Sequence, residues 1–148
     1  MKFQDKRVWI TGASSGIGEA MARQLSGLAS LLIISGLEGE DLQRIKEEIE
    51  NEHTVVEALP FDLGDFVQVE KAAARVLEKH GGVDILINNG GISQRSMVNE
   101  TTMAVDRHIM EVNFFSPVLL TKLMLPAMLS QGAGHIAATS SMVGKFGF

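Results

Sequence analysis

Three glycines stand close together near the N-terminus, within residues 11–18. An apolar run precedes them, and a stretch with helically spaced apolar residues follows. In such a strand–turn–helix unit, Gly12 allows a tight turn, Gly16 lets the backbone approach a phosphate, and Gly18 lets the helix pack against the strand. The start of the helix adds unpaired N–H groups and a partial positive charge. The segment therefore predicts a site for the diphosphate of a dinucleotide. Its other expected lining residues are Ser14, Ser15 and Ile17.

The glycine spacing separates this loop from two related patterns. Three residues lie between Gly12 and Gly16, whereas the common dinucleotide fingerprint has only one residue there. The loop also lacks the Gly-Lys-Ser/Thr ending of a P-loop, which disfavours ATP hydrolysis. An ordinary tight turn is the alternative interpretation.

Polar residues follow two later apolar runs at the point where each run ends. Asp62 could accept a hydrogen bond from the amino group of an adenine. Its alternative role is a helix N-cap, although Asp65 is better placed for that. Asn89 and Gly90 belong to an Asn-Asn-Gly-Gly segment that could surround a ligand or form an ordinary turn.

Two further polar positions could take part in chemistry. Asn113 lies inside a helix-patterned stretch and precedes a proline, which suggests a distorted helix, because asparagine competes with the backbone for hydrogen bonds. A polar residue facing solvent is the alternative. Ser141 follows the last apolar run, where a serine could donate a hydrogen bond to a substrate carbonyl. A cap or turn serine is the alternative there.

The elements that position these residues follow from an alternation of continuous apolar runs and helical stripes. Strands are expected at 8–10, 31–34, 55–59, 83–87 and 135–139, with helices between them. Short connections between strands and helices predict a parallel sheet with right-handed crossovers. We therefore expect one dinucleotide-binding domain over residues 1–148. It would be an α/β, doubly wound, Rossmann-like fold of about five strands.

The segment 101–130 is expected to be mostly helical, with Pro117 and Pro126 bending or splitting it. Its apolar stretches, like the others, are expected to be too short to span a membrane. No signal peptide is expected either, since charged residues such as Lys2 and Asp5 interrupt the N-terminus. The expected location is cytoplasmic.

Composition argues against several classes of function. The net charge is −5 and the basic residues are scattered, which argues against a nucleic-acid partner. The chain has no cysteine, and its four histidines show no ligand spacing, so no metal site is expected.

Taken in order, the glycine loop, Asp62, the Asn-Asn-Gly-Gly segment, Asn113 and the Ser140-Ser141 pair resemble the short-chain dehydrogenase/reductase family over essentially all 148 residues. Residues 94–96 and 121–126 are similar to membrane-associated members, which leaves membrane association of a longer parent open. The resemblance implies hydride transfer between the nicotinamide of NADP or NAD and a small carbonyl or alcohol substrate.

In that family a Tyr exchanges the substrate proton, a Lys lowers its pKa, a Ser polarises the substrate oxygen and an Asn holds a water. Asn113 and Ser141 match the last two by position. A phenol with a pKa of about 10 is a poor base at neutral pH without a cation beside it. This chain contains no tyrosine. We therefore expect it to be the cofactor-binding portion of an oxidoreductase, truncated before the Tyr and Lys and inactive alone.

The resemblance also bears on the choice of cofactor. NAD enzymes usually carry an acid after the second strand, whereas NADP enzymes use an arginine there. Here Gly36 stands where the acid would be and Leu37 where an arginine is often found, while Glu38 is expected to start the next helix. The Ser-Gly pair favours NADP slightly. Ser35 and Leu63 complete the expected cofactor-binding residues.

Two other interpretations share the fold. A non-catalytic dinucleotide-binding or regulatory module is the chief alternative, whereas an epimerase is disfavoured by the glycine spacing. The family resemblance also implies a homo-oligomer formed through the long helix that holds Asn113. The apolar residues expected to be exposed on that helix are Leu119, Leu120, Leu123, Met124, Leu125 and Met128.

Overall fold

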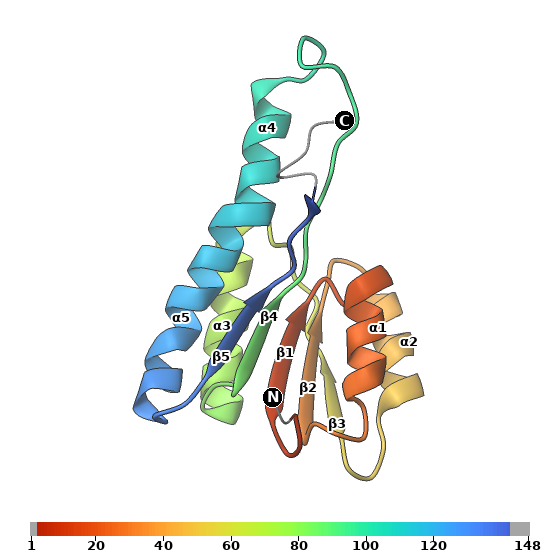
Figure 1. The fold of residues 1–148 in the computed structure, drawn as a ribbon, viewed down its shortest axis with the longest axis vertical. Helices are drawn as coiled ribbons and strands as arrows, with labels where there is room; N and C mark the ends of the chain where they lie inside the picture. The colour runs from red at the N-terminus through yellow and green to blue at the C-terminus, as the bar shows by residue number, and fades with distance from the viewer. Residues whose placement is uncertain (1–2, 143–148) are drawn as a thin grey trace.

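A computed structural model describes residues 3–142 as five parallel strands between two layers of helices (Figure 1). The strands are β1 (Arg7–Thr11), β2 (Leu31–Ser35), β3 (Val55–Ala58), β4 (Ile85–Asn88) and β5 (His135–Ala138). Their order in the sheet is β3-β2-β1-β4-β5, and every neighbouring pair is parallel. The chain therefore moves outward in one direction from β1 to β3 and in the other from β4 to β5. The connections after β1 and β4 leave on opposite faces, which creates the crevice where such sheets bind ligands.

The helices are α1 (Gly16–Leu25), α2 (Gly39–Ile49), α3 (Phe66–His80), α4 (Met103–Met110) and α5 (Ser116–Ser130), with a π-helical segment, η1 (Glu111–Phe115), between the last two. Figure 1 shows α1 and α2 on one face of the sheet and α3 and α5 on the other. Each pair encloses its own apolar core against the sheet. The predicted doubly wound α/β fold is confirmed.

Two interior strands, β1 and β2, contribute much of the buried surface that stabilises the sheet. The side chains of β1 and β2 are almost all buried, as expected for strands covered on both faces. Trp9 is the largest fully buried side chain, and its Nε1 donates to Ser35 Oγ at 2.9 Å. That bond satisfies a buried indole N–H, so the tryptophan adds apolar area without an unpaired donor.

The residues at the two ends of α3 explain where this helix begins and ends. Asp65 is the N-cap and accepts from the backbone N–H groups of Val67 and Gln68 at 3.0 and 3.3 Å. Hydrogen bonds from the Gln68 side chain and backbone hold the pKa of Asp65 below its usual value. At the other end, Gly81 has φ 68°, the left-handed conformation that glycine adopts at helix ends.

The segment from α4 to α5 is one continuous helical rod rather than two helices (Figure 1). Pro117 is the second residue of α5 and directly follows η1, so it has no N–H to donate to the preceding turn. Pro126 lies inside α5, and the expectation that it splits the helix is wrong. Both Pro126 and Lys122, whose carbonyl loses its partner, are exposed, so water can reach that carbonyl.

This continuity corrects the expectation about apolar stretches. Met103–Ser130 is long and apolar enough, by length and composition, to cross a membrane. A mostly buried core helix of a soluble protein meets the same test; here α5 packs along α3, and 28% of the apolar window is buried. The extent of the expected helical segment, residues 101–130, agrees with the structure.

The exposed face of the long helix also differs from the expected one. Leu120, Met124 and Met128 are buried against α3 and the sheet, and Leu119 and Leu123 pack at the edge of that core. Of the predicted set only Leu125 is exposed. The exposed apolar side chains lie instead towards α4 and η1. None of the described residues of α4 is buried, because α4 extends beyond the carboxyl edge of the sheet (Figure 1).

Candidate functional site

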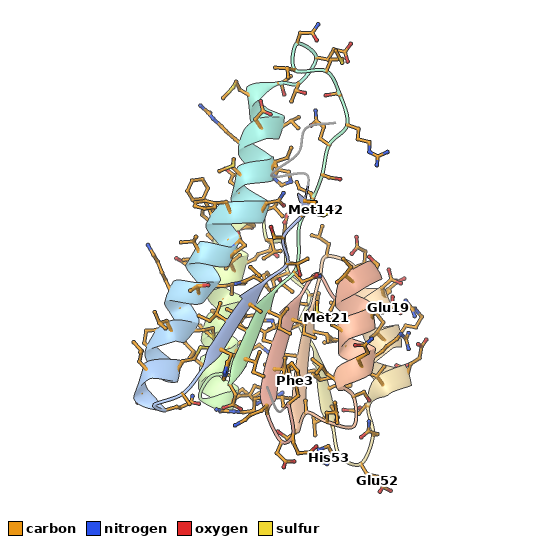
Figure 2. The ribbon with its side chains drawn as sticks, in the orientation of Figure 1. Phe3, Glu19, Met21, Glu52, His53 and Met142 are labelled. Carbon is orange, nitrogen blue, oxygen red and sulfur yellow. The ribbon has the colours of Figure 1, made fainter. Side chains whose placement is uncertain are left out.

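A cavity of about 470 Å³ lies where the carboxyl ends of the strands meet the helices. Figure 2 helps to orient it: Phe3 and His53 lie at the amino edge of the sheet, whereas Met142, which follows β5, lies on the carboxyl side. The predicted cofactor-binding residues that line this cavity are Gly12, Ser14, Ser15, Ile17, Ser35, Asp62, Leu63, Asn89 and Gly90. The fold therefore brings residues from four strand ends into one hollow.

The glycine loop opens the cavity by close approach of two strand ends. Gly12 has φ 65°, and a Cβ built there would lie 2.5 Å from the Cα of Gly90. Gly18 is equally constrained, since a Cβ there would lie 2.6 Å from Asn89 Nδ2. Neither position has room for a side chain, so α1 begins tight against the ends of β1 and β4. Gly16 has φ 58° but open space around it.

Asn89 connects three strand ends with one amide. Its Nδ2 donates to the carbonyls of Thr11 and Gly12 at 3.2 and 3.1 Å, and its Oδ1 accepts from Thr139 Oγ1 at 2.9 Å. Thr11 Oγ1 in turn accepts from the backbone N–H groups of Asn89 and Gly90, both at 3.0 Å. The Asn-Asn-Gly-Gly segment is therefore more than an ordinary turn, because the side chain of Asn89 joins the strand ends beneath the cavity.

One end of the cavity is built around Asp62. Its Oδ1 accepts from the backbone N–H of Gly64 at 2.7 Å, while Asp65 serves as the helix cap. The ring of His108 lies over the same turn, since a Cβ on Gly64 would be 2.7 Å from His108 Cε1. Val112, one turn further along the long helix, also lines this end.

The segment after β2 contributes a further carboxylate, Glu38, which was expected to start the next helix. Ser14 Oγ donates to Glu38 Oε2 at 3.0 Å, which joins the glycine loop to the segment after β2. Gly36 lies beneath this contact, and a Cβ on it would be 2.9 Å from Ser14 Oγ. Glu38 lines the cavity and precedes α2 as its N-cap residue.

Asn113 lies in η1, so the predicted distortion of the helix is confirmed. Its Oδ1 accepts from the Ile92 backbone N–H and its Nδ2 donates to the Ile92 carbonyl, both at 2.8 Å. The residue is exposed, yet both amide groups bind the loop after β4. The alternative of a simple solvent-facing residue is therefore wrong. Asn113 holds the segment that carries Gly91 and Ile92 beside the cavity.

Ser141 is exposed and lies three residues beyond β5. Of the described residues that line the cavity, Thr139 is the last in the chain. The role of Ser141 towards a substrate stays a prediction.

Several lining residues went unrecognised in the sequence. They are Thr11, Phe61, Gly91, Ile92, His108, Val112 and Thr139. Thr11 and Thr139 could have been found as polar residues at strand ends. His108 and Val112 could not, because only the long rod from α4 to α5 brings them over Gly64.

Comparisons with known proteins agree with this geometry. The family model for short chain dehydrogenases matches residues 6–148. The chain is 43% identical to dehydrogenase/reductase SDR family member 7B of Danio rerio, over 97% of this chain and 48% of that protein. It is 42% identical to dehydrogenase/reductase SDR family member 7 of Homo sapiens, over 97% of this chain and 43% of that protein. The chain thus spans about half the length of the curated relatives it matches.

Solved structures give the same result. A metagenomic short-chain oxidoreductase in complex with NADP superimposes with a TM-score of 0.92 at 31% identity, covering 99% of this chain and 66% of that one. A 7α-hydroxysteroid dehydrogenase complexed with NADH and 7-oxo glycochenodeoxycholic acid has the same TM-score at 27% identity, covering 99% of this chain and 57% of that one.

Proposed function

The chain belongs to the short-chain dehydrogenase family, and on that premise we propose that its cavity holds the nicotinamide dinucleotide, NADP or NAD, of an oxidoreductase that acts on a carbonyl or alcohol substrate. The observation that carries the proposal is the fit of the cavity. It lies at the carboxyl edge of a doubly wound sheet, at the start of α1, where Gly12, Ser14, Ser15 and Ile17 line the hollow and open space surrounds Gly16.

In this proposal each wall binds one part of the cofactor. The loop from Gly12 to Gly18 binds the diphosphate through backbone N–H groups, and Asp62 accepts a hydrogen bond from the adenine amino group. Leu63 and Val112 enclose the base, and Ser35 and Glu38 lie at the adenosine ribose. Asn89 and Gly90 shape the path towards the nicotinamide, which supplies or accepts the hydride when the cofactor is bound.

Two residues are proposed for the reaction itself. Ser141 would donate a hydrogen bond to the substrate oxygen, and Asn113 would order the groups around the proton transfer while it holds Ile92. The chain has no tyrosine, so a phenol for the proton step has to come from outside these 148 residues. We therefore expect the 148-residue chain by itself to bind dinucleotide without reducing carbonyl substrates.

Backbone NMR of the 148-residue chain tests the site. On titration with NAD⁺ or NADP⁺, the amide signals of residues 12–18 and 89–91 should shift, because they lie against the bound diphosphate and its neighbours. The amides of Phe3 and His53, at the amino edge of the sheet, serve as the internal control and should stay in place. The absence of any shift at saturating dinucleotide, or shifts confined to the amino edge, would overturn the proposed site.

A non-catalytic dinucleotide-binding module is the second candidate. The two candidates differ in turnover by a longer protein that contains this chain. Carbonyl reduction by such a protein, lost on Ser141→Ala, supports the oxidoreductase. Tight dinucleotide binding without turnover over a broad substrate panel supports the module.

A cytoplasmic location and a homo-oligomer remain part of the proposal.

A further inference from the structure

His108 brings an aromatic ring into the cavity from beyond the sheet. It belongs to α4, yet it lines the cavity at the end where Asp62 lies. Among the described residues that line the cavity, the other aromatic ring is that of Phe61, which is only 7% exposed and packs edge-to-face with Trp9. The side chain of His108, in contrast, is 52% exposed. His108 therefore has ring surface available to a ligand, whereas Phe61 belongs to the core.

The ring of His108 is matched to the turn after β3. A Cβ on Gly64 would lie 2.7 Å from His108 Cε1 and 3.1 Å from His108 Nδ1, so the imidazole occupies the space that a side chain at residue 64 would need. Asp62 Oδ1 accepts from the backbone N–H of Gly64 at 2.7 Å, which holds that carboxylate at the same turn. The glycine thus allows an aromatic ring and a carboxylate to meet at one end of the cavity.

The position over Gly64 is the main restraint on the ring. Glu111 Oε2 lies 3.9 Å from His108 Nδ1, which is too far for a hydrogen bond. The imidazole is the far end of a side chain that is half exposed, so it can turn away if its place over Gly64 is filled. A substitution at residue 64 can therefore move the ring without disturbing the core.

We infer that His108, held over Gly64, packs its imidazole against the adenine of the bound dinucleotide. The inference rests on the proposed function, which places the base beside Asp62, Leu63 and Val112. His108 precedes Val112 by about one helical turn. It also lies over the residue that follows Leu63. A purine presents a flat π-face, and stacking on an aromatic side chain adds affinity without requiring a particular pattern of hydrogen bonds.

Proton NMR of the histidine rings in the 148-residue chain tests the contact directly. At constant pH, titration with NAD⁺ or with AMP should shift the signal of the His108 Cε1 proton, because the ring current of a stacked adenine acts on it. Nicotinamide mononucleotide, which has no adenine, should leave that signal in place. His53, at the amino edge of the sheet, is the internal control, and its signal should stay in place with all three ligands.

Isothermal titration calorimetry with NAD⁺ provides a second measurement. His108→Ala should weaken binding at least about fivefold, the lower end of what one base–aromatic stack contributes. His108→Phe keeps a ring at this position and should bind close to the wild-type value. Met110→Ala is the matched control: Met110 lies on the same helix but lines a separate hollow with Phe66 and Phe115, so its truncation should leave the affinity unchanged.

Gly64→Ala tests whether the turn acts through the ring. The added Cβ would displace the imidazole, so this variant should lose affinity for NAD⁺ as His108→Ala does. In the His108→Ala background the same substitution should cost little more, because the group that it displaces is already absent. Fully additive losses would contradict the inference, since they would show that Gly64 does not act through His108.

The outcomes separate this inference from the function beneath it. If wild type binds neither NAD⁺ nor NADP⁺, the proposed function fails. If NAD⁺ shifts the amides of residues 12–18 while the His108 signal stays in place, or if His108→Ala binds as tightly as wild type, the inference is overturned and the proposed function stands. Circular dichroism confirms that each variant is folded, and the ring signal of wild type decides the question should His108→Ala be unstable.

Discussion

At the scale of single residues, the positions that the sequence predicted well are those where geometry leaves no choice. Gly12 and Asp65 were predictable because a positive φ and a helix cap each demand a particular residue type. Asn89 was predicted to lie at the site. The sequence alone could not show that its side chain bonds to Thr11, Gly12 and Thr139 rather than to a ligand. Each of those partners lies 50 or more positions from Asn89 in the chain.

The glycine loop gives a direct test of close approach. We expect Gly12→Ala to lower the free energy of unfolding by more than the roughly 1–2 kcal/mol of an unfavourable left-handed residue, because its Cβ would also collide with Gly90. Gly27→Ala is the control, since Gly27 has φ 81° but open space around it. Urea unfolding followed by Trp9 fluorescence measures both. Equal destabilisation of the two variants would contradict the collision.

At the scale of elements, the alternating strands and helices were predictable because their periodicity is local. The long helix was predicted in its extent and in its distortion at Asn113, but its unbroken course through Pro126 was not. That course depends on tertiary packing, which keeps Leu120, Met124 and Met128 buried. The consequence reaches the site, because His108 and Val112 lie over the cavity only if the rod is unbroken. Sequence patterns thus predicted the sheet and its edge better than the helical wall above that edge.

The π-helical turn supplies a second prediction. Asn113→Ala removes both hydrogen bonds to the Ile92 backbone and should cost about 1 kcal/mol for each bond. Hydrogen exchange followed by NMR should show faster exchange at the Ile92 amide, with amides in β1 unchanged. Asn99→Ala is the control, because Asn99 is an exposed residue of the same connection between β4 and α4. Unaltered exchange at Ile92 would mean that Asn113 does not hold the loop.

A buried carboxylate connects β3 to α3 and gives a dependence on pH. Glu57, with a side chain only 11% exposed, accepts from Lys79 Nζ at 2.7 Å and lies 2.9 Å from His80 Nε2. Burial alone would raise the pKa of Glu57, but the hydrogen bonds from Lys79 and His80 outweigh it and hold the pKa below the usual value. A carboxyl whose pKa is lower in the folded state stabilises the protein above its unfolded pKa, about 4.3, and loses that contribution as the pH falls further.

Glu57→Gln should therefore lower the free energy of unfolding at pH 7 by about 1–3 kcal/mol, because it leaves Lys79 and His80 without their charged partner. The difference from wild type should shrink as the pH falls below the ordinary carboxyl range and Glu57 becomes protonated. Denaturant melts between pH 3 and pH 7 measure this, with Glu70→Gln, an exposed acid of α3, as the control. A constant difference across that range would show that the charge of Glu57 is not responsible.

At the scale of the whole molecule, one group of exposed apolar side chains lies on the rod beyond the sheet. Met103, Met110 and Phe115, with Phe66 at the start of α3, line a hollow of about 440 Å³. Asp106, Arg107 and Glu111 line the same hollow, so acids and a base stand together with the apolar groups. A two-fold interface brings the same patch together from both subunits, and the acids and the base within this patch can then pair across the axis. We therefore expect a second copy of the chain as the partner.

We accordingly expect the chain to self-associate through α4 and η1. Phe115 is 48% exposed and packs edge-to-face with Phe114 at a centroid distance of 5.2 Å, so a pair of these aromatics from each copy would lie at the centre of the contact. Phe115→Glu should convert the oligomer to monomer in sedimentation velocity or light scattering, because two buried carboxylates would face each other across the two-fold axis. Leu28→Glu is the matched control: Leu28 is 43% exposed in the loop after α1, away from the rod, and its replacement should leave the oligomer intact. A wild-type chain that stays monomeric at high concentration, or dissociation by Leu28→Glu as readily as by Phe115→Glu, would show that the rod is not the contact surface.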